Sequence, residues 1–196
     1  NCRRGVILKR ILIAVVFIFS FYISSFATFF VDVMGADVNA GDLKNGTGFG
    51  GALGFDITPN IAFVYRALMT SYTEDKNKPT ETEYSFFTNL FGIEFVPNLP
   101  QLESLQLRWR TSLLIGPAMG EVAPKSGDNA SDMGLDIALW TGLQYDLTQH
   151  ISPFFEIGYH KASYENDFEK ASIGGYQIAL GVRFYIFGSR DYTSEY

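Results

Sequence analysis

Charged side chains recur inside otherwise apolar segments of this chain. Four are basic and four are acidic: Arg66, Arg108, Arg110, Arg183, Glu94, Asp136, Asp146 and Glu156. A charge buried alone is costly, whereas arginine and carboxylate groups satisfy each other through charge-assisted hydrogen bonds. We therefore predict that these eight residues form an internal charge network. Structural filling of an interior is the simpler interpretation, and a gate or polar path for solutes is the functional alternative.

Catalytic chemistry has little support in the sequence. The chain has two histidines, His150 and His160, and one cysteine, Cys2. A serine nucleophile needs its base within hydrogen-bond reach, but Ser163 follows His160 by three residues and would lie on the opposite face of a strand. Two separated histidines and one remote cysteine offer no metal site. We predict no enzymatic activity, no cofactor and no metal ion.

The segments that must position these residues alternate large apolar side chains with small or charged ones. This period of two is clearest from Met133 to Leu147 and from Tyr176 to Ile186. It indicates β-strands, and breaker residues divide the chain into about eight of them in one domain, 28–187. The predicted strands are Phe30 to Asn39, Gly48 to Ile57, Ile61 to Tyr72, Glu83 to Val96, Leu105 to Ala118, Met133 to Leu147, Pro153 to Tyr164 and Ser172 to Phe187.

The composition of the two strand faces indicates which one is inside. Small residues share the polar face: Gly48, Gly50, Ala52, Gly54, Gly134, Ala138, Gly142, Ala179 and Gly181. Glycine on a water-facing strand costs stability without a packing gain, but small residues fit the inside of a narrow tube. The pattern favours an all-β fold, an eight-stranded antiparallel up-and-down transmembrane β-barrel with its apolar face toward lipid. A soluble barrel or β-rich core with an apolar interior would also alternate and is the alternative.

The two ends of the chain differ from the strands. Basic residues precede the apolar run from Ile11 to Phe19, and Ser25 and Ala27 suit a cleavage site before Thr28. We predict a signal peptide over 1–27, with an over-extended start as one option and an uncleaved anchor as the alternative. Residues 188–196 are predicted to be a short polar tail. The net charge is −6, and no basic stripe offers nucleic acid a binding surface.

The predicted connections alternate between tight turns and longer, more charged loops. The turns are 58–60, 97–104 and 148–152, and the loops are 41–47, 73–82, 120–132 and 165–171. In bacterial barrels the short turns are periplasmic, so both chain ends are predicted to be periplasmic. The loop from Gly120 to Asp132 is the longest, and Lys125, Asp128 and Asn129 are its candidate contact residues.

Two predicted strands fit the alternation poorly. Asp32 and Asp37 have opposite parity, so one of them faces outward or the first strand contains a bulge. In the fourth strand Asn89 shares the outward parity, while Phe86 and Leu90 point inward. A bulge near Thr88 is predicted to correct part of this conflict.

The strand–turn–strand junction Ile57-Thr58-Pro59-Asn60-Ile61 and the last strand, Gly174 to Phe187, resemble small outer-membrane barrels. This family is typified by OmpW, by OmpX and by the membrane domain of OmpA, and the whole mature chain resembles OmpW first. The resemblance implies that Gly181, Phe184 and Ile186 form the signal that the barrel-assembly machinery recognises. The tail after Phe187 departs from the family, whose members often end on an aromatic residue.

The resemblance implies an OmpW-like protein of the bacterial outer membrane that passes small hydrophobic solutes. The alternative is a structural or adhesin-like barrel whose outer loops contact host surface molecules, without transport. Outer-membrane lipids are expected partners in either case.

Overall fold

The computed structural model describes residues 28–40, 43–74, 81–125, 128–164 and 174–187. The predicted signal peptide and polar tail lie outside the described residues. Eight strands form the molecule: β1 (Phe29–Ala40), β2 (Leu43–Thr58), β3 (Ile61–Glu74), β4 (Thr82–Phe95), β5 (Leu107–Pro124), β6 (Ala130–Tyr145), β7 (Ile151–Tyr164) and β8 (Gly174–Phe187).

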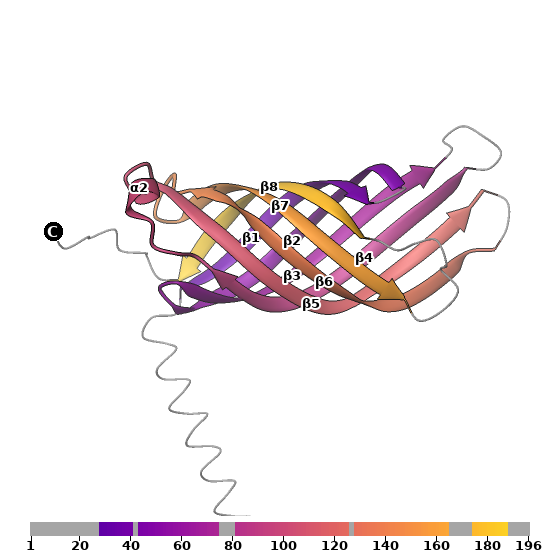
Figure 1. Cartoon of the computed structure of the whole chain (residues 1–196), viewed down its shortest axis with the longest axis horizontal. Helices are drawn as coiled ribbons and strands as arrows, with labels where there is room; N and C mark the ends of the chain where they lie inside the picture. Colours follow the sequence, from indigo (N-terminus) through magenta and orange to yellow (C-terminus); the bar gives the residue numbers. More distant parts are fainter. Residues whose placement is uncertain (1–27, 41–42, 75–80, 126–127, 165–173, 188–196) are drawn as a thin grey trace, which may run out of the picture.

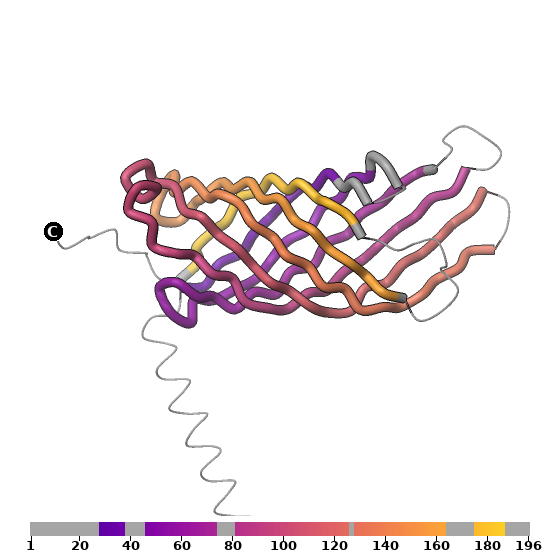
Figure 2. Tube along the Cα trace, viewed as in Figure 1, coloured from indigo at the N-terminus to yellow at the C-terminus, as the bar shows by residue number. Residues whose placement is uncertain are grey.

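The strands close into a single antiparallel barrel. Each strand pairs with the next one along the chain, and β8 pairs with β1 to complete the ring. The tilted strands wind around one long axis, and no strand edge along the wall is left open (Figures 1 and 2). The predicted eight-stranded up-and-down barrel is confirmed.

One end of the barrel carries the short connections β2–β3, β4–β5 and β6–β7. We call it the α2 end, after the short helix that it contains. The connection after β4 contains a short helix, α2 (Pro100–Glu103), and Gln106 has a positive φ of 57°. The predicted strand start at Leu105 is two residues too early, because the chain turns here and β5 begins at Leu107. Within the described residues, no helix combines the length and apolar character that a membrane span requires.

The opposite end carries the other four connections between the eight strands, and we call it the far end. The predicted loops 41–47 and 120–132 are too long, because β2 begins at Leu43, β5 runs to Pro124 and β6 begins at Ala130. The end of β5 pairs with both neighbouring strands. Val122 on β5 lies opposite Tyr84 on β4 and opposite Ala130 on β6. A strand that meets water on both faces needs no apolar alternation, so its sequence resembles a loop.

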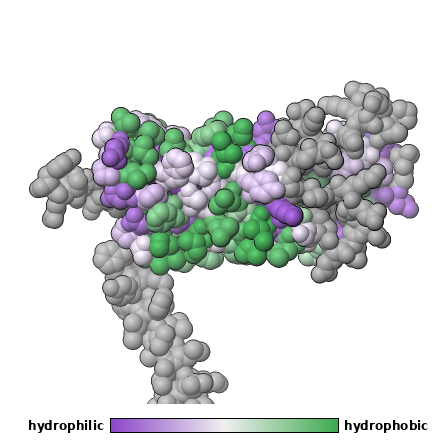
Figure 3. Space-filling model, viewed as in Figure 1, coloured by the Kyte–Doolittle hydropathy of each residue, from purple (hydrophilic) through white to green (hydrophobic). Residues whose placement is uncertain are grey.

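Side-chain direction follows the predicted parity. Leu139 and Leu180 are 50% and 64% exposed on the outer wall, whereas Ala138 and Ala179 between the wall and the axis are 1% and 0% exposed. Apolar side chains cover the middle of the outer wall, and hydrophilic ones gather toward its ends (Figure 3). The small and charged face is the interior, as predicted.

The structure shows how β1 and β4, the two strands that fit the alternation poorly, are arranged. In β4 the predicted bulge near Thr88 is absent. The β3–β4 register is unbroken from Ile61–Phe95 to Glu74–Thr82, so that prediction is wrong. Phe86 points inward and is accommodated because its partner on β5 is Gly120. On β1, Asp32 is buried in the interior and Asp37 faces outward near the far end.

Candidate functional site in the barrel interior

A cluster of six charged side chains fills the lumen in the half of the barrel nearer the α2 end, and we call it the central network. Its members come from β1, β3, β4, β5, β7 and β8: Asp32, Arg66, Glu94, Arg110, Glu156 and Arg183. Regular alternation aims every one of them at the barrel axis. Three are basic and three are acidic, so the network has no formal net charge.

Ion pairs connect the central network continuously across the lumen. Arg66 Nη2 lies 2.9 Å from Glu156 Oε2, and Arg110 Nε lies 2.8 Å from Glu156 Oε1. Arg110 Nη2 also lies 3.1 Å from Asp32 Oδ2 and 2.9 Å from Glu94 Oε2. Arg110 therefore links three carboxylates.

Arg183 completes the central network with two two-pronged contacts. Its Nε and Nη2 donate to the two oxygens of Asp32 at 2.7 and 2.8 Å. Its Nη1 and Nη2 donate to the two oxygens of Glu94 at 2.6 and 3.1 Å. Such paired geometry fixes the position of a guanidinium group as well as its charge.

The burial of the central network decides what it can do. No member is more than 1% exposed. Removing one partner would leave an uncompensated buried charge, which typically costs about 3–5 kcal/mol. The network therefore closes the tube at this level, and a solute could pass through only after its ion pairs separate.

Each arginine of the central network also lies against an aromatic ring. The guanidinium carbon of Arg183 is 3.5 Å from the ring centre of Phe30. Arg66 lies 4.6 Å from Trp140, and Arg110 lies 4.5 Å from Phe154. A cation over an aromatic face is stabilised by the charge distribution of the ring, more strongly where water is absent.

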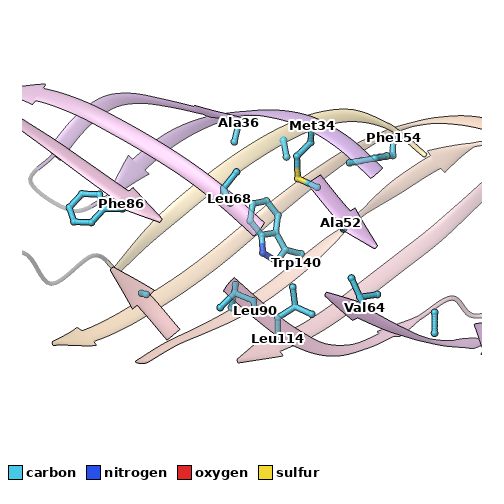
Figure 4. Packing of buried hydrophobic residues seen from close by; sticks show 14 of the residues in the cluster. Met34, Ala36, Ala52, Val64, Leu68, Phe86, Leu90, Leu114, Trp140 and Phe154 are labelled. Carbon is cyan, nitrogen blue, oxygen red and sulfur yellow. The ribbon is translucent and has the colours of Figure 1, made fainter. Parts of the chain in front are cut away.

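Glycines make room for these three rings. Phe30, Trp140 and Phe154 each face a glycine in register on the adjacent strand: Gly54, Gly158 and Gly181. A Cβ atom added at any of the three glycines would meet the ring. Three stacks of glycine, aromatic ring and arginine therefore set the shape of the interior. Figure 4 shows Trp140 and Phe154 among the surrounding apolar residues.

A separate polar cluster lies inside the α2 end. Arg108 Nε is 2.6 Å from Asp146 Oδ2, and Arg108 is partly exposed at 18%. Asp146 Oδ1 accepts hydrogen bonds from Ser152 Oγ and from Gln144 Nε2, both at 2.9 Å. Arg108 and Asp146, two of the eight residues predicted to form one network, thus pair with each other apart from the central network.

A third polar cluster lies inside the wall toward the far end. His160 Nδ1 is 3.3 Å from Asp136 Oδ2, and His160 Nε2 is 2.8 Å from Gln177 Nε2. Asp136 therefore pairs with a histidine, whereas an arginine partner was predicted. Ser163 is exposed on the outer wall, on the face opposite to His160. Among the described residues, no group of three His, Cys, Asp or Glu side chains is placed to hold a metal ion.

Sequence reasoning brought together most of the central network but missed Asp32. The available signal was its parity, which matches that of the inward residues Phe30 and Met34. The conflict with Asp37 obscured it, because either aspartate could have been the outward one. The register settles the choice, since Asp32 is the direct β1 partner of Arg183 on β8.

The other predicted residues lie outside the interior clusters. On β8, Phe184 and Ile186 are 41% and 53% exposed on the outer wall, and Gly181 packs against Phe154 on the inside. Lys125, Asp128 and Asn129 are exposed in the β5–β6 connection at the far end.

A closed eight-stranded antiparallel barrel with an apolar outer wall and a filled polar interior is the fold of the small outer-membrane β-barrels. No protein-family model matches the chain, and no curated protein matches its sequence. Solved structures do match it.

Neisserial surface protein A superposes with a TM-score of 0.57 at 13% identity, over 82% of this chain and 97% of that one. The N-terminal β-barrel domain of Pseudomonas aeruginosa OprF gives 0.53 at 16% identity, over 81% and 97%. Ail, the attachment invasion locus protein of Yersinia pestis, solved with the heparin analogue sucrose octasulfate, gives 0.51 at 14% identity, over 81% and 97%. At these identities the similarity is one of fold, and it supports an outer-membrane location.

Proposed function

We propose that this chain is an integral outer-membrane protein with a closed lumen, and that it acts through the surface of its far end. In this proposal the α2 end and both chain termini face the periplasm. One observation carries the proposal, namely that six buried, mutually neutralising charges fill the cross-section of the lumen in the half nearer the α2 end. An eight-stranded barrel that is filled by its own side chains leaves no open channel, so it is better suited to be a scaffold.

The outer wall supports the proposed orientation. Toward the far end the apolar wall gives way to outward, exposed charges: Asp37, Glu83, Glu121 and Lys161. Toward the α2 end it finishes on exposed aromatic residues that include Phe95, Trp109 and Tyr145. Aromatic residues are enriched at membrane interfaces, and bacterial barrels keep their short turns in the periplasm. In the same proposal Gly181, Phe184 and Ile186 guide insertion by the barrel-assembly machinery.

The far end offers the surface for a partner. Lys125 pairs with Glu81 at 3.4 Å, and Asn129 Nδ2 donates to Glu121 Oε1 at 3.3 Å, so side chains on both sides of this connection are held to the strands. Ail was solved with a sulfated polyanion. Here the described far end is mainly acidic, which favours a neutral or cationic partner over a polyanion.

Electrical recording in planar lipid bilayers tests the closed lumen. The purified protein is expected to give no steady conductance, because the central network leaves no aqueous path. A sustained ohmic current from the unmodified protein would contradict the proposal. A variant with Arg110→Ala and Arg183→Ala, if it folds, is expected to leak.

A loop variant tests the surface role. Cells that display the protein are compared with cells that carry the triple variant Lys125→Ala, Asp128→Ala and Asn129→Ala. The loop variant is expected to lose adhesion to cultured host cells or to surfaces coated with polylysine. The double variant Gln149→Ala and His150→Ala, at the α2 end, is the matched control. Equal adhesion of both variants would rule out this loop as the contact.

Passage of small hydrophobic solutes is the second candidate. It is favoured by an apolar layer of interior side chains between the central network and the far end, formed by Leu68, Phe86 and Leu90 (Figure 4). A solute held there could leave only sideways into the bilayer, because the central network blocks the lumen toward the α2 end. Faster uptake of a hydrophobic dye by cells with the protein, lost with Phe86→Asp, would support this route over the closed scaffold.

A further inference from the structure

One polar side chain lies in the apolar belt of the outer wall, away from both ends. Asn89 on β4 faces outward between Phe87 and Phe91, which are 42% and 45% exposed. Phe95 at the α2 end is six positions after Asn89, and Glu83 near the far end is six positions before it. With a rise of about 3.3 Å per residue and a strand tilt of about 40°, Asn89 lies about 15 Å along the barrel axis from the Phe95 level. That is near the middle of an apolar band about 25 Å tall.

Hydrocarbon leaves part of this side chain unsatisfied. Tyr65 on β3 donates its hydroxyl to Asn89 Oδ1 at 2.6 Å. The described residues supply no acceptor for the Asn89 Nδ2 group. An amide that loses its water partners without gaining others is destabilising.

Other outward polar groups of the belt are satisfied within the same chain. Thr111 and Thr141 share a hydrogen bond of 3.0 Å, and Trp109 Nε1 donates to Thr111 at 3.0 Å. These three residues lie toward the α2 end, where water is close. Asn89 differs both in its depth and in its free amide.

On the neighbouring strands, short side chains lie beside Asn89. Its register partner on β3 is Ala67, and the β4–β5 register on either side places Pro117 opposite it on β5. The β4–β5 ladder skips this position, and proline has no N–H with which to pair. Small side chains on a lipid-facing surface let two backbones approach closely, as at helix interfaces in membranes.

We propose that Tyr65, Ala67, Asn89 and Pro117 form the centre of a contact between two copies of this chain within the membrane. A second copy fits because the site is self-complementary. Each copy offers free N–H donors on Asn89 and acceptor lone pairs on Asn89 Oδ1 and the Tyr65 hydroxyl, as a two-fold interface requires. The Phe87 and Phe91 rings beside the amides supply apolar area. This proposal is independent of what the far end binds.

Cysteine cross-linking in phospholipid vesicles tests the contact, with the full chain carrying Cys2→Ser as background. Ala67→Cys is expected to give a covalent dimer with a short bifunctional thiol reagent. Leu180→Cys is the matched control, because it is outward and 64% exposed on β8, across the barrel from β4. Adding Asn89→Leu to Ala67→Cys is expected to lower the dimer yield at limiting protein about tenfold.

Folding is checked by the shift of the unboiled protein on a denaturing gel, and Asn89→Leu is expected to fold because it makes the wall more apolar. Cross-linking of Ala67→Cys and Leu180→Cys to the same extent would overturn the proposal. So would a dimer yield that Asn89→Leu leaves unchanged, or the absence of any Ala67→Cys dimer. In these last two cases lipid covers the amide. None of these outcomes bears on the conductance experiment, so the two proposals fail separately.

Discussion

At the scale of single residues, Arg110 is the hub of the interior. It contacts Asp32, Glu94 and Glu156, while Phe154 packs against its guanidinium group. A single positive charge thus holds together three buried carboxylates from three strands. Without Arg110, these three carboxylates would have only Arg66 and Arg183 to neutralise them, and the network would carry a buried net negative charge.

Replacement of Arg110 by leucine is therefore expected to lower the free energy of unfolding by about 3–5 kcal/mol. Urea unfolding in lipid vesicles, followed by tryptophan fluorescence, measures this change. Arg108→Leu is the control, because Arg108 is partly exposed where it pairs with Asp146, and its loss is expected to be smaller. Adding Glu156→Gln to Arg110→Leu should recover part of the stability. Equal losses for Arg110→Leu and Arg108→Leu would show that the central network does not hold the barrel together.

At the scale of elements, neighbouring strands fit together through the three glycine, aromatic and arginine stacks. The aromatic ring of one strand lies over the glycine of the next, and β6 with β7 gives the plainest case. There the three atoms nearest to a Cβ added at Gly158 all belong to the Trp140 ring. Two of the glycines that suggested a narrow interior, Gly54 and Gly181, therefore make room for the rings that pack against the arginines, and Gly158 does the same.

Gly158→Val is expected to displace the Trp140 ring and to destabilise the protein by about 1–3 kcal/mol, because the filled interior has no room for added methyl groups. The control is Gly35→Val on β1, which faces outward and where an added Cβ meets nothing closer than 4.0 Å. That change should be neutral or slightly stabilising in lipid. Thermal or urea unfolding of both variants, with near-ultraviolet circular dichroism of the tryptophans, distinguishes them. Unchanged stability in Gly158→Val would mean that the Trp140 ring can move aside without cost, which would contradict the tight packing.

At the scale of the whole molecule, the barrel is a tube with its polar groups inside and its apolar groups outside. This arrangement is stable only where the outer wall meets hydrocarbon, because the exposed apolar belt encircles the molecule. The belt, the buried ion pairs and the apolar side chains packed beside them in the interior together account for the fold.

Nitroxide labels test the whole-molecule arrangement in vesicles. Labels at Leu139 and Leu180 are expected to collide with oxygen, which concentrates in the acyl chains. A label at Lys125, at the far end, is expected to collide with a water-soluble nickel complex. Water-like collisions at Leu180 would mean that the belt does not face lipid.

The sequence by itself determined the number of strands, their antiparallel order and the direction of their side chains. A period of two needs no tertiary information, because successive side chains of any strand point to opposite faces. It also placed Arg66, Glu94, Arg110, Glu156 and Arg183 in the interior.

Only the tertiary structure decided which charges meet. Residues such as Arg183 and Asp32 are 151 positions apart, and their contact depends on how β8 closes against β1. The tilt and register of closure also separate Arg108 and Asp146 from the central network and give Asp136 a histidine partner. Strand ends at the far end were hidden for a related reason, since strands outside the bilayer have water on both faces and lose the alternation that identifies them.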